Sequence, residues 1–412
     1  MTIQQPVAAA FDVEQVRADF PILSRQVHGK PLVYLDSAAS AQKPLAVIEA
    51  MSRAMTHSYA NVHRGLHTLA NETTDAYEAA RQKVAAFIGA TPSEIVFTKG
   101  GTEAINLVAA GIGMSLGEGD EVLLTEMEHH ANIVPWHFLR ERKGVVLKFV
   151  PVSDQGVLDL EAFQRLLGPR TRVVALTHIS NVLGTVNPIA SLTAMAQAAG
   201  AKVLIDGCQG VVHTPLDVKA LGCDFYVFSG HKLYGPTGIG VLYGKADRLA
   251  ELPPYQGGGE MIGVVRLEDI TYAEPPHRFE AGTPPIVEAI GLGAAIDWLS
   301  RLDRHAVARH EAGLYRRVRE ALSSANWLRV IGEAPDKGAI LSFTVEGAHA
   351  HDVAQILDRY GVAVRAGTHC AEPLMRRFGL TSSARASFAL YNTESEADAF
   401  VDALTRTQAF FA

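Results

Sequence analysis

The chain has few cysteines, no excess of basic charge and no long apolar run. Its three cysteines, Cys208, Cys223 and Cys370, form no CxxC pair, which excludes a disulfide framework and favours a reducing, cytoplasmic setting. Cys208 and Cys223 are expected to pack as small apolar side chains. Acidic residues outnumber basic ones, 44 to 37, so nucleic acid is not an expected partner. No run approaches a membrane span, and no basic residue precedes Arg17, so we expect neither a membrane segment nor a signal peptide.

The 412 residues are enough for two domains. From about residue 90 to 245, short apolar strands alternate with helical stretches, which predicts an α/β fold with a mostly parallel sheet. The predicted strands are residues 94–98, 121–125, 172–177, 202–206 and 224–229. Because ligands of such sheets bind beyond the carboxyl ends of the strands, polar motifs at these exits are expected to share one site.

The pattern changes after a glycine cluster at 257–259 and a proline pair at 284–285. We expect an N-terminal segment over 1–30 that packs with the small domain, a large domain over 31–285 and a small α/β domain over 286–412. In the N-terminal region we predict a helix over 12–19 and a strand over 32–36. The elements predicted for the small domain are a helix over 286–304, a strand over 340–345, a helix over 351–360, strands over 362–365 and 385–390, and a helix from 394.

Lys232 directly follows the apolar strand at 224–229 and precedes a turn rich in glycine and proline. At a strand exit the amine is partly desolvated, and desolvation disfavours its charged form. A neutral lysine amine attacks carbonyl groups, so Lys232 is a candidate for a Schiff base. An ordinary surface lysine in a loop is the alternative.

A second motif, Gly100-Gly101-Thr102, lies between the strand at 94–98 and a helix expected from residue 104. Glycines allow close approach of the backbone to an anion, and the start of a helix favours negative charge, so Gly101 and Thr102 suit a phosphate group. The pattern GxxxxGK[ST] is missing, which argues against a nucleotide P-loop. A helix cap formed by Thr102 and Glu103 is the alternative.

Asp206 ends the apolar strand at 202–206. A carboxylate at this place is costly unless a cationic or protonated group meets it. A protonated ring nitrogen would serve, and Gln209 would reach a ring substituent. A helix cap by Asp206 is compatible with this role.

His129 and His130 are adjacent, but neither HExxH nor a Cys/His cluster is present, so no metal site is expected. His129 is placed at the sheet edge either as an acid/base or stacking group or as a structural histidine. Asn181 follows the strand at 172–177, and its polar side chain can extend into the expected site, but no motif around it indicates a particular role.

The small domain contributes Cys370, in a glycine-bearing loop beside Arg365 and His369. A thiolate is favoured near cationic groups, and the thiolate is the nucleophile. The alternative is a packed, unreactive thiol. Arg385 opens the strand predicted at 385–390 and would fork onto a substrate carboxylate, unless it forms a surface ion pair.

With these residues assembled, the chain resembles the class V branch of fold-type I pyridoxal-phosphate enzymes, and more closely the SufS-like (group II) cysteine desulfurases. The resemblance spans nearly the whole chain and implies an α/β fold-type I transferase with a large cofactor-binding domain. The motifs that carry it are LDSAAS at 35–40, NVHRGLH at 61–67, EHHANIVPW at 128–136, SGHK at 229–232, GGGEMI at 257–262, RFEAGTP at 278–284 and RASFALYN at 385–392.

The resemblance implies roles for residues at matching positions. Lys232 would form the Schiff base with pyridoxal 5′-phosphate, and Asp206 would pair with its pyridine nitrogen. Gln209 would neighbour its phenolic oxygen, and His129 would stack on the ring as the acid/base. The residues implied for the phosphate are Gly101, Thr102, Ser229 and His231.

For the reaction, the resemblance implies that Asn181 and Arg385 hold the carboxylate of L-cysteine and that Cys370 accepts its sulfur. The products would be L-alanine and a persulfide on Cys370. Thr283 would reach the phosphate of the other subunit of a homodimer. The short cysteine loop implies a separate acceptor protein of the SufE or SufU kind, in Fe–S cluster assembly.

Two positions depart from the family pattern. Thr368 stands where many relatives carry a second histidine, and Gly101 where a threonine is frequent. The alternatives are a selenocysteine lyase, a cysteine sulfinate desulfinase or an aminotransferase on the same scaffold, or an inactive scaffold. Cys370 favours sulfur transfer, and the presence of Lys232 and Asp206 argues against an inactive scaffold.

Overall fold

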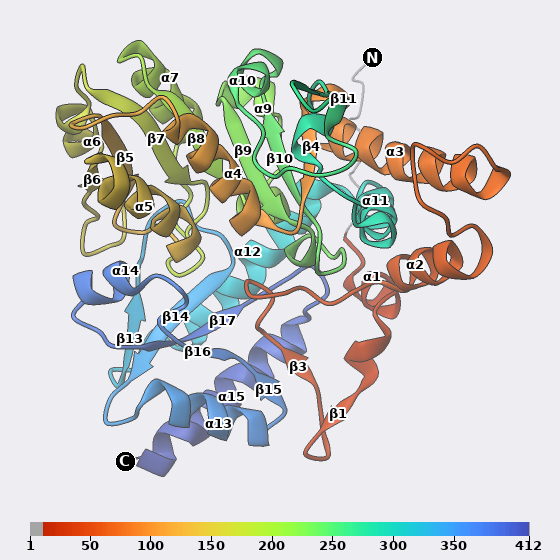
Figure 1. The fold of residues 1–412 in the computed structure, drawn as a ribbon. Helices are drawn as coiled ribbons and strands as arrows, with labels where there is room; N and C mark the ends of the chain where they lie inside the picture. The colour runs from red at the N-terminus through yellow and green to blue at the C-terminus, as the bar shows by residue number, and fades with distance from the viewer. Residues whose placement is uncertain (1–10, 412) are drawn as a thin grey trace, which may run out of the picture.

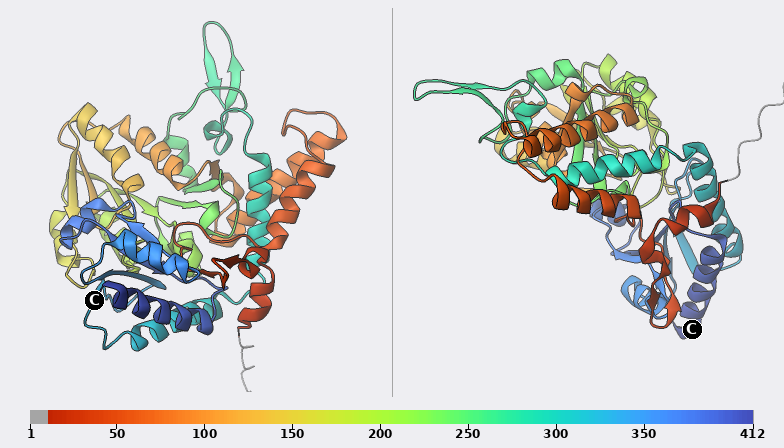
Figure 2. Two further views of the ribbon diagram at one scale, coloured as in Figure 1. Left: turned by 90° about the horizontal axis from the view of Figure 1, so that it is seen from below. Right: turned by 90° about the vertical axis from the view of Figure 1, so that its right-hand side faces the viewer.

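The computed structural model describes residues 11–411, which form a large domain and a small domain packed against it (Figure 1). Residues 1–10 of the predicted N-terminal segment lie outside the described residues. A hairpin of β11 (Ile262–Val265) and β12 (Ile270–Tyr272) projects from the large domain (Figure 2). Within 11–411, no helix is both long and apolar enough to cross a membrane.

The large domain is built on a seven-stranded sheet in the order β4-β10-β9-β8-β7-β5-β6. In this order, adjacent strands from β9 through β8, β7 and β5 to β6 are parallel to one another. β10 is antiparallel to both of its neighbours, β4 and β9. The strands are β4 (Ile95–Thr98), β5 (Glu121–Thr125), β6 (Val146–Val150), β7 (Thr171–Thr177), β8 (Lys202–Asp206), β9 (Phe225–Ser229) and β10 (Gly240–Gly244). The prediction of a mostly parallel sheet is confirmed.

Helices cover both faces of this sheet. Both faces are apolar, since successive side chains of each strand point to opposite sides. Val174 and Ile205 belong to one apolar cluster, and their neighbours Val173 and Leu204 belong to another. The helices of this domain are α2 (Leu45–His57), α3 (Thr68–Ile88), α4 (Gly101–Gly113), α5 (Val134–Lys143), α6 (Leu160–Leu166), α7 (Ile189–Ala198), α8 (Gly210–His213), α9 (Val218–Leu221) and α10 (Ala246–Glu251). α11 (Ile286–Leu299), predicted as the first helix of the small domain, packs against α2 and α3 of the large domain.

The small domain has an antiparallel sheet in the order β13-β14-β17-β16. Its strands are β13 (Leu328–Ile331), β14 (Ile340–Val345), β16 (Arg365–Gly367) and β17 (Ser383–Ser387), and its helices are α12 (Arg304–Ala321), α13 (Ala350–Arg359), α14 (Glu372–Arg377) and α15 (Glu394–Phe411). The strand predicted at 385–390 is wrong in its bounds, because the ladder with β14 ends at the pair Ile340 and Ser387. The chain leaves the ladder at Phe388.

Two further predicted elements are divided in the structure. The strand predicted at 362–365 splits into β15 (Val362–Ala363), which pairs with β3 (Val33–Tyr34), and β16, which pairs with β17. The strand predicted at 32–36 is correspondingly short: β3 is the continuous strand within it, and Asp36 forms an isolated parallel bridge with Ser387. The helix predicted over 286–304 ends at Leu299, and Asp303 caps α12 by accepting the His305 N–H at 2.9 Å.

The N-terminal part contains α1 (Val13–Ala18), β1 (Gln26–Val27) and β2 (Lys30–Pro31). Arg17 pairs with Glu396 of α15 at 2.7 Å, and its Nη1 donates to the Tyr391 carbonyl at 2.9 Å. Asp19 accepts the indole N–H of Trp298 in α11 at 2.6 Å. This segment therefore contacts both domains.

Candidate functional site

A cavity of about 180 Å³ lies between the ends of the large sheet and the small domain. Most of the predicted site residues line it, although they come from segments far apart in the chain. The predicted residues found there are Gly101, Thr102, His129, Asn181, Asp206, Ser229, His231, Lys232, Cys370 and Arg385. Gln209 and Thr283 are not among them.

Lys232 enters this cavity from a 3₁₀ turn, Gly230–Lys232, that directly follows β9. A side chain at position 230 would not fit, because a Cβ there would lie 2.7 Å from Ile239 Cγ2. Glycine thus allows the strand exit to pack closely against Ile239. Within residues 11–411, no hydrogen bond or ion pair engages the Lys232 amino group.

Asp206 is a buried carboxylate, 6% exposed. Its Oδ1 accepts the Cys208 N–H at 3.0 Å, and within the described chain it has no ion pair. This bond closes a local turn, and α8 has no side-chain cap, so Asp206 is not a helix cap. Gln209 is also buried, and its Nε2 donates to the Ala38 carbonyl at 2.8 Å, next to the cavity that Ala38 lines.

The anion cradle forms at the start of α4, which begins at Gly101 rather than at residue 104. Ser229 Oγ accepts the Gly101 N–H at 2.8 Å. A Cβ on residue 101 would lie 2.8 Å from Cys208 Sγ and 3.3 Å from Ser229 Oγ, so the close approach explains the glycine. Gly100 at the N-cap has no side chain to cap α4, and Glu103 Oε2 accepts the Lys99 N–H at 2.6 Å. Thr102 forms no capping bond among the described residues, so its predicted role as a cap is wrong. The start of α4 is left open for an anion.

His129 precedes the short 3₁₀ helix His130–Asn132, and its Nδ1 accepts the Ala131 N–H at 3.1 Å. This bond places the ring proton on Nε2. Burial, and then the charge of Lys232, lower the pKa of His129 to about 4. The imidazole is therefore neutral near pH 7, which suits ring stacking and proton exchange.

Arg385 is buried, 2% exposed, so the predicted surface ion pair is wrong. Its Nη1 donates to the Asn181 carbonyl at 2.8 Å, and its Nη2 approaches Asp36 Oδ1 at 3.3 Å. Burial lowers the pKa of Arg385 to about 10. Its Nε has no partner among the described residues, so the guanidinium keeps a donor for a substrate anion.

The cysteine loop is held by residues of the large domain. His369 and Cys370 both have positive φ, 54° and 56°. The Cys370 carbonyl accepts the His130 N–H at 2.7 Å, and His130 Nε2 accepts the Glu372 N–H at 2.9 Å. Asn181 Nδ2 donates to the His369 carbonyl at 2.8 Å. Cys370 is partly buried and its thiol is free.

The expectation that His369 supplies positive charge to Cys370 is wrong. His369 Nε2 donates to the Ser383 carbonyl at 3.0 Å, and burial lowers its pKa to about 3, so the ring is neutral near pH 7. Arg365 also lines the cavity and is the cation of this loop.

Arg365 and His369, which the sequence analysis names as neighbours of Cys370, line the cavity with it. Cys208 also lines it, although it is buried and burial raises its pKa to about 12. The sequence indicated only a small packed side chain at Cys208, so its place in the cavity was missed.

Thr283 lies elsewhere, in a smaller cavity that Lys99, Glu103 and Gln256 also line. Within one chain, it is therefore separate from the cavity that holds Lys232.

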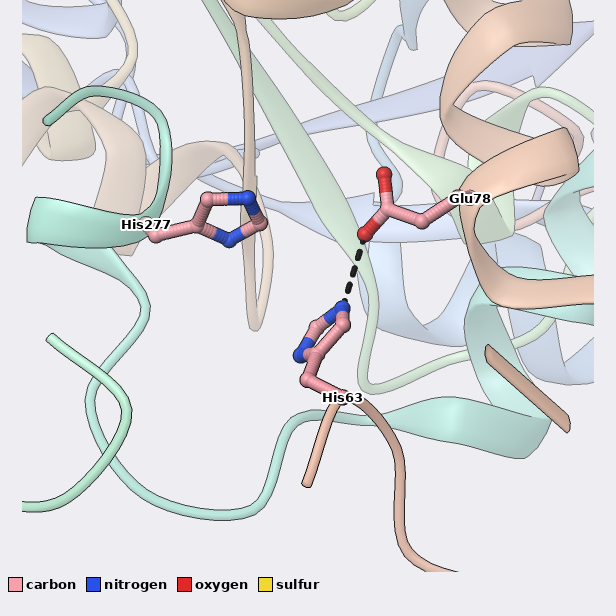
Figure 3. A group of neighbouring side chains, drawn as sticks. All are labelled: His63, Glu78 and His277. Atoms are coloured by element: carbon pink, nitrogen blue, oxygen red, sulfur yellow. Dashed lines mark hydrogen bonds and ion pairs between the residues drawn. The ribbon is translucent and has the colours of Figure 1, made fainter. Parts of the chain in front are cut away.

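A second group of polar residues, His63, Glu78 and His277, lies outside this cavity (Figure 3). Their possible ligand atoms lie within 4.8 Å of one another. Glu78 already binds His63 Nε2 at 2.9 Å and Arg81 Nε at 2.8 Å. Against the burial that raises it, these two donors lower the pKa of Glu78 to about 2. A guanidinium on the same carboxylate disfavours a metal ion, so we interpret the group as an ion-pair network.

Comparisons with known proteins define the class. The chain belongs to the aminotransferase class-V family, whose family model matches residues 33–400. A relative from Serratia proteamaculans (strain 568) named cysteine desulfurase is 52% identical over 402 residues, which cover 97% of this chain and 99% of the relative.

Solved structures of related enzymes have the same fold as this chain. The S-sulfonic acid form of the cysteine desulfurase CsdA from Escherichia coli is 42% identical, with a TM-score of 0.91 over 98% of this chain and 100% of that one. A C-DES mutant with glycine covalently linked to the PLP cofactor is 25% identical, with a TM-score of 0.81 over 94% of this chain and 98% of that one. The fold-type I architecture expected from the motifs is thus confirmed.

The cavity fits pyridoxal phosphate on its own chemistry. Asp206 is a buried carboxylate without an ion pair among residues 11–411, and a protonated ring nitrogen would balance its charge. Lys232 offers an amino group without a partner in the described chain. At the start of α4, Ser229 already binds the N–H of the close-packed Gly101, and the N–H groups that follow it are offered to a phosphate.

Proposed function

We propose that the protein is a pyridoxal-phosphate-dependent cysteine desulfurase, which converts L-cysteine to L-alanine and leaves a persulfide on Cys370. One observation carries the proposal: Lys232 of the large domain and Cys370 of the small domain line the same cavity. The first residue serves cofactor chemistry, and the second is a nucleophile for sulfur. The relatives named cysteine desulfurase support it.

The cofactor would be held through its ring and its phosphate. Asp206 would pair with the ring nitrogen, Gln209 would lie near the phenolic oxygen, and His129 would stack on the ring. The residues proposed for the phosphate are Gly101, Thr102, Ser229 and His231. Bound there, pyridoxal phosphate supplies an aldehyde for amines and a ring that stores electrons.

The chain's own groups perform the remaining steps. Arg385 and Asn181 bind the substrate carboxylate, and the unpartnered Nε of Arg385 supports this role. Lys232 removes the α-proton. The Cys370 thiolate then attacks the substrate sulfur, so an S–S bond forms as the C–S bond breaks and its electron pair returns to the substrate carbon. His129, neutral near pH 7, is suited to exchange a proton at Nε2.

The persulfide would pass to a separate acceptor protein of the SufE or SufU kind and feed Fe–S cluster assembly. The bonds from His130 and Asn181 to the cysteine loop support this step, because a loop held in place does not carry sulfur far from the cavity. We also assign the protein to the cytoplasm, in keeping with its three free cysteines.

The protein would work as a homodimer in which Thr283 reaches the phosphate bound in the other subunit. Two observations support this arrangement. Thr283 lies outside the cavity of its own chain. The β11–β12 hairpin exposes apolar side chains that a second subunit would cover, namely Val264, Val265, Leu267, Ile270 and Tyr272.

Selenocysteine lyase or cysteine sulfinate desulfinase activity is the alternative on the same scaffold. Alanine formation by wild type and by Cys370→Ala separates these functions, with cysteine, selenocysteine and cysteine sulfinate as substrates. We expect the variant to lose activity on cysteine alone, because only that reaction needs the thiol to take sulfur. Loss of all three activities, or full retention of the cysteine activity, would contradict the proposal.

A further inference from the structure

His130 contacts the cysteine loop twice, although the reaction above gives it no role. Its backbone N–H donates to the Cys370 carbonyl at 2.7 Å, and its ring Nε2 accepts the Glu372 N–H at 2.9 Å. Because Nε2 accepts, the ring is neutral and carries its proton on Nδ1. One residue of the large domain thus holds the small-domain loop on both sides of Ala371.

The second contact caps a helix that has no cap of its own. α14 begins at Glu372, and Ala371 before it provides no side-chain bond. Pro373 has no N–H, so Glu372 contributes one of the few donors of the first turn. Such donors need an acceptor from outside the helix. The His130 ring supplies it from the other domain.

The loop needs such support because of its backbone conformation. His369 and Cys370 are consecutive non-glycine residues in the left-handed region, at φ of 54° and 56°. Side-chain-bearing residues keep this conformation only where their surroundings enforce it. The direction of the Cys370 thiol depends on that conformation, so whatever fixes the loop also fixes the thiol.

His130 is itself well anchored. In the same 3₁₀ turn, Asn132 Nδ2 donates to Glu128 Oε2 at 2.7 Å. Glu128 is fully buried, and its Oε1 accepts the Thr177 N–H at the end of β7 at 3.0 Å. The bond from His130 therefore ties the cysteine loop to the central sheet.

We propose that His130 is a positioning residue for persulfide formation: by capping α14 from the large domain, its ring holds the Cys370 thiol in the reactive geometry. The inference rests on the proposed function, which supplies the step that His130 serves. His130 does not line the cavity, so cofactor binding and proton removal by Lys232 proceed without its ring. Only the transfer of sulfur to Cys370 slows.

Three variants of the full-length holoenzyme test this inference. His130→Leu removes the acceptor, and His130→Gln keeps one of similar reach. His137→Leu is the matched control, because His137 is exposed on α5 and, within the described chain, its ring pairs with Glu141 alone, at 3.2 Å. Hydrogen exchange of the peptide over 371–378 reports the cap, and the rate of persulfide formation on Cys370 reports its effect.

In His130→Leu, we expect faster exchange of that peptide and persulfide formation slower by about tenfold or more, since small misplacements of reacting groups cost roughly up to a hundredfold. The KM for cysteine and the absorbance change on adding cysteine stay as in wild type. His130→Gln and His137→Leu behave like wild type in both measurements.

Wild-type exchange and rate in His130→Leu would overturn the inference, and so would a His130→Gln protein as slow as His130→Leu. The exchange measurement does not depend on activity. If the wild type forms no persulfide at all, the proposed function fails, and the exchange rates still decide whether His130 holds the loop.

Discussion

Glu280 forms a buried ion pair whose loss should be measurable as a loss of stability. Its two oxygens accept Arg81 Nη1 at 2.7 Å and Nη2 at 2.8 Å. It also accepts the Phe97 N–H at 2.7 Å and the Tyr77 hydroxyl at 3.1 Å. Arg81 is 1% exposed and Glu280 8%. The pair thus ties α3 and β4 to the segment that leads to Thr283.

Glu280→Gln leaves the Arg81 guanidinium buried without this carboxylate. Breaking a buried pair in this way costs about 3–5 kcal/mol. Glu78 keeps its 2.8 Å contact with Arg81 Nε, so we predict the lower end, about 3 kcal/mol. Arg81→Met should cost about as much, because it leaves Glu280 buried and unpaired. The double variant buries no unpaired charge at this site and should cost clearly less than the two single changes together.

Equilibrium unfolding in urea, followed by circular dichroism, measures the three variants against wild type. We predict a coupling energy of about 2 kcal/mol or more between the two positions. A cost of less than about 1 kcal/mol for Glu280→Gln, or a double variant that loses as much stability as both single variants added, would refute the importance of this buried pair.

Three further predictions concern the cavity. Gly101→Thr should weaken pyridoxal-phosphate binding about tenfold, because the new Cβ would lie 2.8 Å from Cys208 Sγ and overpacking costs roughly 1–3 kcal/mol. Adding Cys208→Ala should restore binding in a fluorescence titration. Equal affinities of wild type, Gly101→Thr and the double variant would count against the steric reason. The free energy of unfolding should fall as the pH drops from about 6.5 to about 4. Burial lowers the pKa of His129 to about 4 and that of His369 to about 3, whereas in the unfolded chain both bind protons at an ordinary histidine pKa of about 6.5. A urea midpoint that does not fall over this pH range would contradict the prediction. Arg385→Lys should raise the KM for cysteine about tenfold, because lysine lacks the planar fork, and an unchanged KM in steady-state kinetics would exclude the proposed carboxylate contact.

Much of the large sheet could be predicted, because its inner strands are apolar runs that end at polar residues. β10 was not predicted. Its residues Gly240–Gly244 continue a glycine-rich turn, and the strand exists through its pairing with β4 and β9, which no local pattern encodes. β6 was missed because it lies at the edge of the sheet. Only Val150 at its end is buried, so its sequence is not a continuous apolar run.

The meeting of His129, Asp206 and Lys232 could be predicted, since each follows a strand whose end lies at the same edge of the sheet. The charge of His369 could not, because its low pKa depends on burial by the folded chain. Nor could the bond from His130 to Glu372, which joins two domains across 242 positions of sequence.

The proposal that sulfur passes to Cys370 is tested most directly by mass spectrometry of the holoenzyme after incubation with cysteine and no acceptor. We predict one added sulfur atom on the peptide that holds Cys370, and no addition in Lys232→Ala, which lacks the amine for the first step. An unmodified Cys370 peptide in the wild type, or the same adduct in Lys232→Ala, would contradict the proposal.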